Sequence, residues 1–492
     1  MDREILIRAD ASPAIGTGHL MRCLALALAA RELGIRVRLI ARLGVPWVQE
    51  RLMHEDVALT EVPEEMPVHE QPEALLAQLA NEKKTDGERG WVVLDGYHFG
   101  LDCQQAVRAA GFKLLVIDDY AHLSEYSCDI LLNQNIGAEE LAYKGDIGQK
   151  LLGSKYALLR PEFLVARTRA EERQLPEKAK IILLTLGGSD ISKHLAHIVP
   201  NFSIPELEGC IVRVIAGTMP PERISESFQG CPAKVEIVDR VDDMPTLLLN
   251  TDLCVTAGGS TCWELCCLGI PFLTVEIAEN QRSIIQHLAN FGIADMFSGN
   301  SFAIALKTPF NKETTSKLKA LVDGKGCQKT LAVIANFPDL ILRKAQPEDY
   351  MLVFALANDV KVRENAFSSS RITEEDHVQW YDDRLKVEDS PFYLAFSNNE
   401  FVGYVRYDKT EVRGEQVVTI AITEQWRGKR IATWLLRESA KSVFAGGADS
   451  IVAWVKPENS ASQRAFQKAG YVFLGQKQYR ERTMCCFQLR AK

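Results

Sequence analysis

Residues 5–30 constrain the fold most, because they join a short apolar segment, a glycine-containing turn and a long run of helix formers. Ile5–Ile7 is β-branched and apolar, as in a buried strand of a parallel sheet. Pro13, Gly16 and Gly18 end this segment. Leu20–Leu33 contains no helix-breaking residue and is rich in Ala and Leu. We therefore predict a strand, a turn and a helix whose first amide groups face an anion above the sheet.

His19 stands at the start of the predicted helix. An imidazole beside an anion site suits general base chemistry near neutral pH. The alternative is a histidine that only caps or packs against the helix. Gly16-x-Gly18 lacks the third glycine of a dinucleotide-binding fingerprint, and no acidic residue follows the next strand, Val37–Ala41, at the expected place. The turn therefore does not predict dinucleotide binding.

The whole chain predicts an α/β protein with three domains. Its 492 residues suggest about three domains. Strands and helices alternate through residues 1–157 and again through 158–337, which predicts two Rossmann-type domains. Residues 338–492 differ, because three strands expected to be antiparallel precede an amphipathic helix at Thr433–Phe444. We expect an α+β fold there.

Polar side chains follow two buried strands of the first domain. Asp95 and Tyr97 come at the end of one strand, and Asp118 and Asp119 come at the end of the next. Ligands bind at the carboxyl edge of such sheets, so we expect these four side chains to share a crevice with His19. The alternative is that the aspartates only cap the helices that follow.

Two glycine turns mark the second domain. Residues 187–189 (Gly-Gly-Ser) and residues 257–261 (Ala-Gly-Gly-Ser-Thr) each follow a predicted strand. Glycines and hydroxyl residues at a helix start form a nest for phosphate groups. Glu264 lies one helical turn further, where its carboxylate could reach a ribose diol.

Composition excludes several other classes. The net charge of −8 and the lack of a Lys/Arg cluster argue against nucleic-acid partners. No apolar run approaches the roughly 18 residues of a membrane span, and we expect no signal peptide. No Cys-x-x-Cys occurs, and His194 and His197 have no third ligand nearby, so we predict no metal. Reduced cysteines suit a cytoplasmic location. The oligomeric state stays open.

Two motifs together resemble a known enzyme family. Arg8-Ala-Asp10 with Gly16-x-Gly18-His19-x-x-Arg22 looks like the UDP-sugar hydrolases of pseudaminic acid biosynthesis, which are relatives of the GT-B glycosyltransferases. Residues 258–264, with Gly269-x-Pro271 and Gln281, are similar to the UDP-binding motif of that superfamily. The resemblance covers residues 1 to about 335 and implies a GT-B-like pair of domains.

That family removes UDP from 2,4-diacetamido-2,4,6-trideoxy-β-L-altropyranose. The resemblance implies that His19 is the base that activates water against the anomeric carbon. We add Tyr97 to the catalytic group as part of the sugar pocket. The residues then expected to bind the UDP-sugar are Asp10, Gly16, Gly18, Arg22, Gly187, Gly188, Ser189, Gly259, Ser260, Thr261, Glu264 and Gln281.

The third domain resembles the GNAT acetyltransferases. Their acetyl-CoA signature, (Gln/Arg)-x-x-Gly-x-(Gly/Ala), is matched by residues 427–432 except that Arg430 replaces the usual glycine. The tyrosine that often serves as general acid falls at Phe466, so Tyr471, a water molecule or an inactive domain all remain open. The residues expected to bind acetyl-CoA, a cosubstrate rather than a bound cofactor, are Arg427, Gly428, Lys429, Arg430, Ile431, Ala432, Asn459 and Ser462.

Together the resemblances imply a bifunctional enzyme of pseudaminic acid biosynthesis. It would N-acetylate the 4-amino group of UDP-4-amino-4,6-dideoxy-β-L-AltNAc and then hydrolyse the diacetamido product. Three alternatives remain: a GT-B glycosyltransferase with a UDP-sugar donor, a hydrolase of a related diamino-trideoxyhexose with an inactive GNAT domain, and a non-catalytic sugar-nucleotide sensor.

Overall fold

The chain packs as two compact units in the computed structural model. One unit comprises residues 1–30 and 35–334, and the other comprises residues 335–492 with 31–34. The first unit contains two separate sheets, and the second contains one. The boundary at residue 157 stays a prediction. The structure describes residues 4–13, 15–62, 70–80, 90–173, 176–187, 192–217, 219–239, 241–308, 312–334, 340–387, 390–397 and 399–491.

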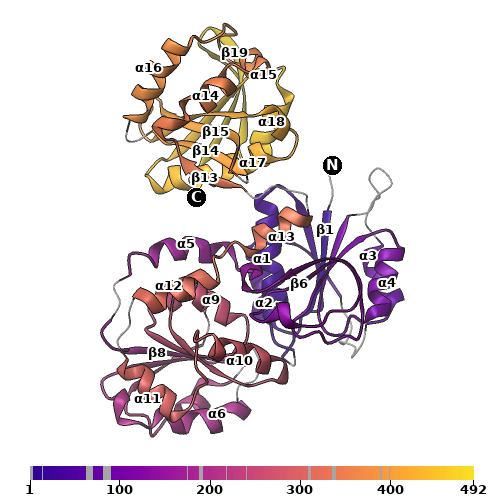
Figure 1. Cartoon of the computed structure of the whole chain (residues 1–492), viewed down its shortest axis with the longest axis vertical. Coiled ribbons are helices and arrows are strands. Elements are labelled where there is room, and N and C mark those ends of the chain that lie inside the picture. The colour runs from indigo at the N-terminus through magenta and orange to yellow at the C-terminus, as the bar shows by residue number, and fades with distance from the viewer. Residues whose placement is uncertain are drawn as a thin grey trace. The chain divides into compact units, whose positions relative to one another are not determined.

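The first sheet is fully parallel, with strand order β3-β2-β1-β4-β5-β6-β7. Helices cover both of its faces (Figure 1), which is why its central strands are apolar on both sides. The strands are β1 (Glu4–Ala9), β2 (Arg36–Ala41), β3 (Ala58–Glu61), β4 (Trp91–Asp95), β5 (Lys113–Ile117), β6 (Tyr126–Asn133) and β7 (Gly145–Leu152). The helices are α1 (Gly18–Glu32), α2 (Pro46–His54), α3 (Pro72–Leu79) and α4 (Leu101–Ala109).

The second sheet is also parallel, with order β10-β9-β8-β11-β12. Two hydrophobic clusters pack against it, and one of them contains the fully buried Trp263. The strands are β8 (Ile181–Thr185), β9 (Ile211–Ile215), β10 (Lys234–Val238), β11 (Leu253–Ala257) and β12 (Phe272–Val275). The helices are α5 (Pro161–Arg169), α6 (Ser192–Ile198), α7 (Pro221–Ser227), α8 (Met244–Leu249), α9 (Thr261–Leu268), α10 (Arg282–Asn290), α11 (Gly299–Lys307), α12 (Lys312–Leu321) and α13 (Gly326–Ile334).

Both parallel sheets reverse their strand order at one point. In the first sheet the reversal lies between β1 and β4, and in the second it lies between β8 and β11. Ligands bind outside the carboxyl ends of strands at such switch points. His19 follows β1 and Asp95 ends β4, whereas Gly187 follows β8 and Ser260 follows β11. The predicted site residues therefore occupy both switch points.

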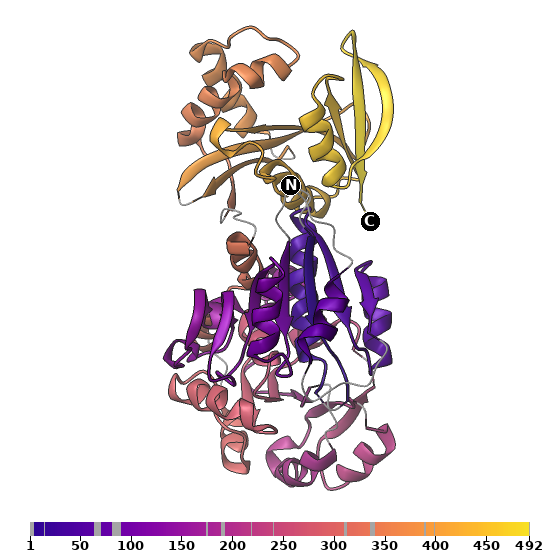
Figure 2. The same cartoon turned by 90° about the vertical axis from the view of Figure 1, so that its right-hand side faces the viewer.

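The third sheet has the order β13-β14-β15-β16-β17-β19-β18. All its pairs are antiparallel except β16–β17, which pairs only over residues 415–417 and 450–452 (Figure 2). The predicted α+β character of this region is confirmed. The strands are β13 (Ile341–Lys344), β14 (Phe392–Ser397), β15 (Glu400–Lys409), β16 (Glu415–Ile422), β17 (Ser450–Val455), β18 (Val472–Tyr479) and β19 (Arg482–Arg490). The helices are α14 (Tyr350–Ala357), α15 (Val360–Asn365), α16 (Glu374–Leu385), α17 (Ile431–Ala445) and α18 (Ser460–Lys468).

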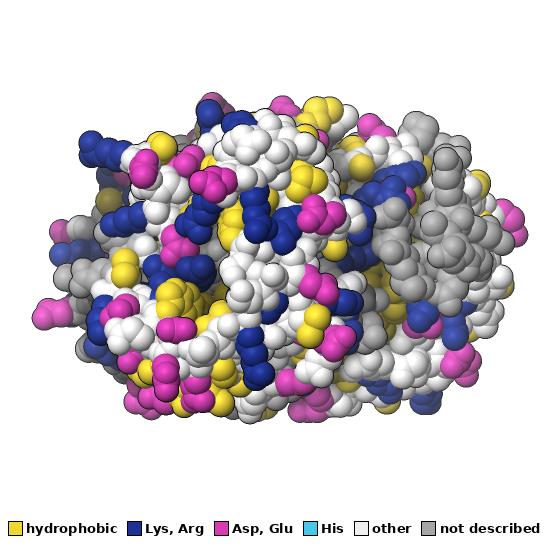
Figure 3. Space-filling model, turned by 90° about the horizontal axis from the view of Figure 1, so that it is seen from above, with side chains coloured by type: hydrophobic (Ala, Val, Ile, Leu, Met, Phe, Trp, Pro, Cys, Tyr) yellow, Lys and Arg dark blue, Asp and Glu magenta, His cyan; other side chains and the backbone are white. Residues whose placement is uncertain are grey.

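Charged side chains of both signs are interspersed over the face drawn in Figure 3. Among the helices of the described residues, none is long and apolar enough to cross a membrane.

Candidate active sites

His19 is held by the carboxylate of Asp95. The Nδ1 atom of His19 lies 2.6 Å from Oδ1 of Asp95, which is fully buried, while 13% of the His19 side chain is exposed. Nη2 of Arg22 also lies near this Nδ1, at 3.1 Å, but the contact with Asp95 is shorter. A carboxylate can only accept, so we assign the proton to Nδ1, which donates it to Asp95. The Nε2 atom of His19 is then the basic one. Sequence reasoning placed both residues in one crevice, and the structure joins them directly.

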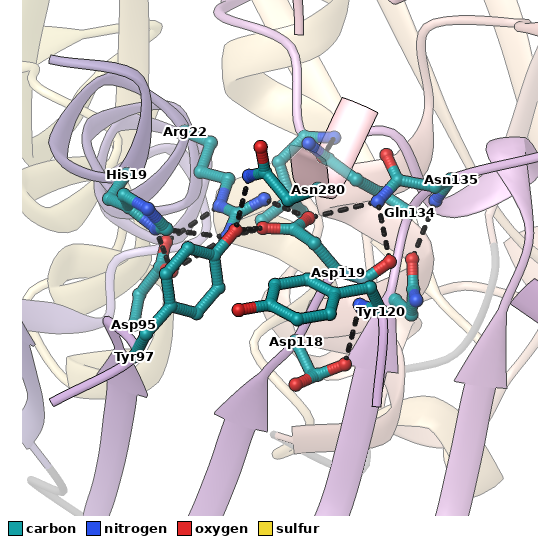
Figure 4. Close-up of polar contacts among 12 residues, drawn as sticks. His19, Arg22, Asp95, Tyr97, Asp118, Asp119, Tyr120, Gln134, Asn135 and Asn280 are labelled. Carbon is teal, nitrogen blue, oxygen red and sulfur yellow. Dashed lines mark hydrogen bonds and ion pairs between the residues drawn. The ribbon is translucent and has the colours of Figure 1, made fainter. Parts of the chain in front are cut away.

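Arg22 lies between two carboxylates, one helical turn after His19 (Figure 4). It donates to Asp95 through Nε and Nη2 at 2.7 Å each, and to Asp119 through Nη1 at 2.7 Å. Burial raises the pKa of the Asp95 carboxyl, but the charges and hydrogen bonds of Arg22 and His19 together outweigh burial and hold this pKa below its usual range. Asp95 therefore remains an anion that orients His19.

Tyr97 connects this network to the second sheet of the same unit. Its hydroxyl donates to Asp119 over 2.7 Å and accepts from Nδ2 of Asn280 over 3.0 Å. Its ring packs edge-on against His19, with 5.0 Å between ring centroids. Burial and the charge of Asp119 raise the pKa of Tyr97, so the phenol stays protonated. Asn280 lies in a 3-10 helix, Glu279–Gln281, between β12 and α10.

The two adjacent aspartates have different partners. Asp119 binds Arg22, Tyr97 and Asn135, so it belongs to the His19 network. Asp118 instead accepts from the backbone amides of Tyr120 and Ala121, at 2.9 and 2.6 Å. These contacts close a turn, and the described residues between β5 and β6 contain no helix, so the helix-capping alternative holds for neither aspartate.

Asp10 lies outside the His19 network. It is fully buried, contacts Arg8, accepts from the amide of Arg42 over 2.7 Å, and lies 3.0 Å from Nε2 of His98. These partners occupy its carboxylate, and its pKa falls to about 2 because hydrogen bonds and the charge of Arg8 outweigh burial. The assignment of Asp10 to UDP-sugar binding has no support in this geometry.

The two glycine motifs face each other within the first unit. A Cβ atom built on Gly18 would lie 4.0 Å from Oγ of Ser260, the residue that precedes α9. Gly16 adopts φ 76°, and no heavy atom lies within 4 Å of a Cβ built there or on Gly259. The side chain of Ser260 does not cap α9. Open space, glycine backbone and a free helix start together suit a phosphate group.

Glu264 faces Arg160, with 3.5 Å between Oε1 and Nη2. Burial raises the pKa of the Glu264 carboxyl to about 7, and the charge of Arg160 offsets this only in part. The hydrogen bond from Arg160 is long, so this carboxyl is suited to accept further hydrogen bonds from a diol. The sequence did not predict Arg160 as part of the site, because this residue precedes α5 and lies far from any motif.

Other predicted UDP-sugar residues have mixed placements. Gln281 accepts from the amide of Ile277 over 3.2 Å and so braces the segment between β12 and α10 that contains Asn280. Gly187 adopts φ 87° at the end of β8, with no atom within 4 Å of a Cβ built on it. Gly188 and Ser189 lie outside the described residues.

The predicted acetyl-CoA loop joins β16 to α17. Gly428 adopts φ 77°, and Arg430 adopts φ 63° at the N-cap of α17. This left-handed conformation explains why glycine is usual there. Arg427 donates to Asp359 over 2.5 Å and to the carbonyl of Ile422 over 2.9 Å, so its side chain anchors the loop. Lys429 lies over the ring of Trp426, and Ile431 and Ala432 form the first turn of α17.

The second predicted acetyltransferase motif includes Asn459, the N-cap residue of α18. Asn459 accepts from the amide of Ser462 over 3.1 Å, which is an N-cap contact. Phe466 and Tyr471 are buried at 4% and 3% exposure and pack edge-on against each other. Burial raises the pKa of Tyr471 well above its usual range, so this phenol is a poor proton donor.

Within the part of the chain that the structure describes, no group of three or more His, Cys, Asp or Glu side chains could hold a metal. The prediction of a metal-free reaction stays a prediction.

Asn135 and Asn280 were missing from the predicted site. Asn135 comes shortly after the end of β6, as Asp119 does after β5, whereas Asn280 lies further from β12, in the 3-10 helix Glu279–Gln281. Polar residues after strands were therefore the available signal, but only the tertiary contacts with Asp119 and Tyr97 distinguish them from ordinary loop residues.

Comparison with known proteins gives matches for both units. Residues 339–472 match the family model described as "Acetyltransferase (GNAT) domain". The chain is 24% identical over 296 residues to the UDP-2,4-diacetamido-2,4,6-trideoxy-beta-L-altropyranose hydrolase of Campylobacter jejuni, covering 59% of this chain and 97% of that protein.

Two further relatives match over shorter segments. The spore coat polysaccharide biosynthesis protein SpsG of Bacillus subtilis is 25% identical over 198 residues, covering 37% of this chain and 57% of SpsG. The UDP-N-acetylglucosamine–N-acetylmuramyl-(pentapeptide) pyrophosphoryl-undecaprenol N-acetylglucosamine transferase of Sulfurimonas denitrificans is 29% identical over 121 residues, covering 24% and 35%. The chain therefore joins a region homologous to the altropyranose hydrolase of C. jejuni to a C-terminal GNAT acetyltransferase domain.

Proposed function

We propose that the first unit hydrolyses the bond between a sugar and UDP, with His19 as the general base. The observation that carries this proposal is the His19–Asp95 contact at the switch point of the first sheet, opposite the helix start at Ser260. The substrate is UDP-2,4-diacetamido-2,4,6-trideoxy-β-L-altropyranose, as the name of the C. jejuni relative suggests.

In the proposed reaction, Nε2 of His19 takes a proton from a water molecule. The water oxygen bonds to the anomeric carbon while the bond from that carbon to the UDP oxygen breaks. Asp95 stabilises the imidazolium that forms, and Arg22 keeps Asp95 in place. UDP leaves as an anion, stabilised by amides at the start of α9. Tyr97 and Asn280 line the sugar side of this site.

We propose that the second unit transfers an acetyl group from acetyl-CoA to the 4-amino group of UDP-4-amino-4,6-dideoxy-β-L-AltNAc. The divergence of β16 and β17 beyond residue 417 and the Gly428 turn support acetyl-CoA binding there. The amine nitrogen bonds to the acetyl carbon, and the thiolate of CoA leaves and takes a proton. The product is the substrate of the first unit, so the two reactions are consecutive.

The decisive experiment follows UDP and CoA together after the 4-amino UDP-sugar is added, with and without acetyl-CoA. We expect UDP only when acetyl-CoA is present, with CoA formed alongside. If UDP is released equally with and without acetyl-CoA, and no CoA is formed, the acetyltransferase assignment is contradicted. The reaction contains no sugar or lipid acceptor, so absence of UDP even from the diacetamido substrate would favour a glycosyltransferase or a sensor.

A further inference from the structure

A second imidazole–carboxylate pair lies beside the first. The Nδ1 atom of His122 contacts Oδ2 of Asp118, whose side chain is fully buried, and only 10% of the His122 side chain is exposed. Asp118 also accepts from the hydroxyls of Tyr126 and Tyr143, over 2.8 Å each. The reaction proposed above uses none of these groups.

His122 and His19 both pack against the ring of Tyr97. The Tyr97 ring packs edge-on against both imidazoles, with 5.0 Å between ring centroids to His19 and 5.2 Å to His122. Tyr120 packs 5.2 Å from Tyr97 and 5.8 Å from His122, and 38% of it is exposed. His122 therefore belongs to the same edge of the first sheet as the catalytic group, and it packs against a ring that solvent reaches.

The hydrogen bonds of Asp118 fix the tautomer of His122. Burial raises the pKa of the Asp118 carboxyl, but its bonds to His122 and Tyr126 outweigh burial and hold this pKa below its usual range. A carboxylate at this position accepts the proton on Nδ1, which leaves a lone pair on Nε2 of His122. That Nε2 atom is buried and has no hydrogen-bond partner within the described residues. Buried acceptors without a partner are unfavourable and rare.

We propose that Nε2 of His122 accepts a hydrogen bond from an N–H or O–H group of the sugar, so that His122 is a positioning residue for the hexose. This rests on the proposed function, because it takes the sugar to lie beside Tyr97. An acetamido N–H is the kind of donor that a diacetamido sugar presents. Because Nε2 is buried, a neighbouring side chain must move to admit this donor, and the partly exposed Tyr120 ring packs against His122.

The test compares binding of UDP with binding of UDP-2,4-diacetamido-2,4,6-trideoxy-β-L-altropyranose by calorimetry. The full chain carries His19→Ala so that the sugar nucleotide survives. In His122→Asn, the amide can still donate to Asp118, but nothing replaces Nε2. We expect about five- to tenfold weaker binding of the sugar nucleotide, as for one lost hydrogen bond, and unchanged binding of UDP.

Tyr126→Phe is the matched control, because it removes another hydrogen bond to Asp118 without changing His122. We expect it to leave the ratio of the two dissociation constants unchanged. If His122→Asn weakens both ligands equally, or neither, the inference is wrong.

Hydrolysis by the unaltered protein is tested separately. If the protein releases UDP but His122→Asn leaves the ratio of the two dissociation constants unchanged, this inference is wrong and the hydrolase proposal stands. If the protein releases no UDP but His122→Asn changes the ratio of the two dissociation constants, the inference is supported and the hydrolase proposal is wrong.

Discussion

At the scale of single residues, the carboxylate behind His19 is the most informative contact. Asp95→Asn places an amide where Nδ1 of His19 needs an acceptor, so the imidazole loses its tautomer and orientation. We expect kcat for UDP release to fall by about 10²-fold or more, with a smaller change in KM. Steady-state UDP release measures both.

Asp119→Asn is the comparison for that prediction, since Asp119 also binds Arg22 but not His19. We expect a smaller loss of kcat than in Asp95→Asn. Equal losses at matched thermal stability would mean that Arg22, rather than the tautomer of His19, explains the effect.

The raised pKa of Glu264 predicts that the free energy of unfolding depends on pH. Its pKa is raised on folding from 4.5 to about 7, chiefly by burial, so the folded state binds this proton more tightly than the unfolded state. Its contribution to the free energy of unfolding is therefore full below pH 4.5 and is lost as the pH rises towards 7. Relative to Glu264→Gln, which cannot titrate, the wild type should lose on the order of 2 kcal/mol over that range. Urea unfolding at several pH values measures the difference, and a constant difference would show that Glu264 ionises normally.

At the scale of elements, the two adjacent glycines that precede α9 have different surroundings. A Cβ on Gly258 would lie 2.6 Å from Ile285 on α10, whereas a Cβ on Gly259 meets nothing within 4 Å. We expect Gly258→Ala to lower the free energy of unfolding by about 1–3 kcal/mol, since α10 must shift. Gly259→Ala should leave stability nearly unchanged but weaken UDP binding, because its methyl group enters the open space. Thermal melts and UDP titration distinguish them, and the reverse pattern would contradict the proposed phosphate position.

At the start of α17, two substitutions of Arg430 separate the backbone contribution from the side-chain contribution. Arg430 holds a left-handed conformation that glycine adopts without strain. Arg430→Ala keeps that backbone conformation without the guanidinium, so Arg430→Gly should be more stable than Arg430→Ala by about 1 kcal/mol. Urea unfolding of the two variants measures the backbone contribution. Acetyl-CoA titration of the same pair against wild type measures what the guanidinium contributes, and equal stability of the two variants would contradict the strain argument.

At the scale of the whole molecule, the two proposed activities belong to different compact units. His19→Ala should therefore abolish UDP release while leaving CoA formation from the 4-amino UDP-sugar within about twofold of wild type. Parallel assays of UDP and CoA on one preparation make this test. Loss of both products in a normally folded variant would mean that the sites are coupled.

The sequence alone determined the fold class, because apolar strand segments, glycine turns and helix formers are local features. It also selected His19, Asp95, Tyr97 and Asp119, since each follows a predicted strand or starts a helix. Parallel strands expose such positions at one edge.

Only the tertiary structure decided which of these side chains meet. The strand order brings β1 next to β4, so His19 reaches Asp95 across 76 positions of sequence. The same packing turned Asp10 inward and brought Asn280 to Tyr97. Residue type and spacing restrict what a side chain can do, but hydrogen bonds act over about 3 Å, and the partner at that distance is set by packing between distant segments.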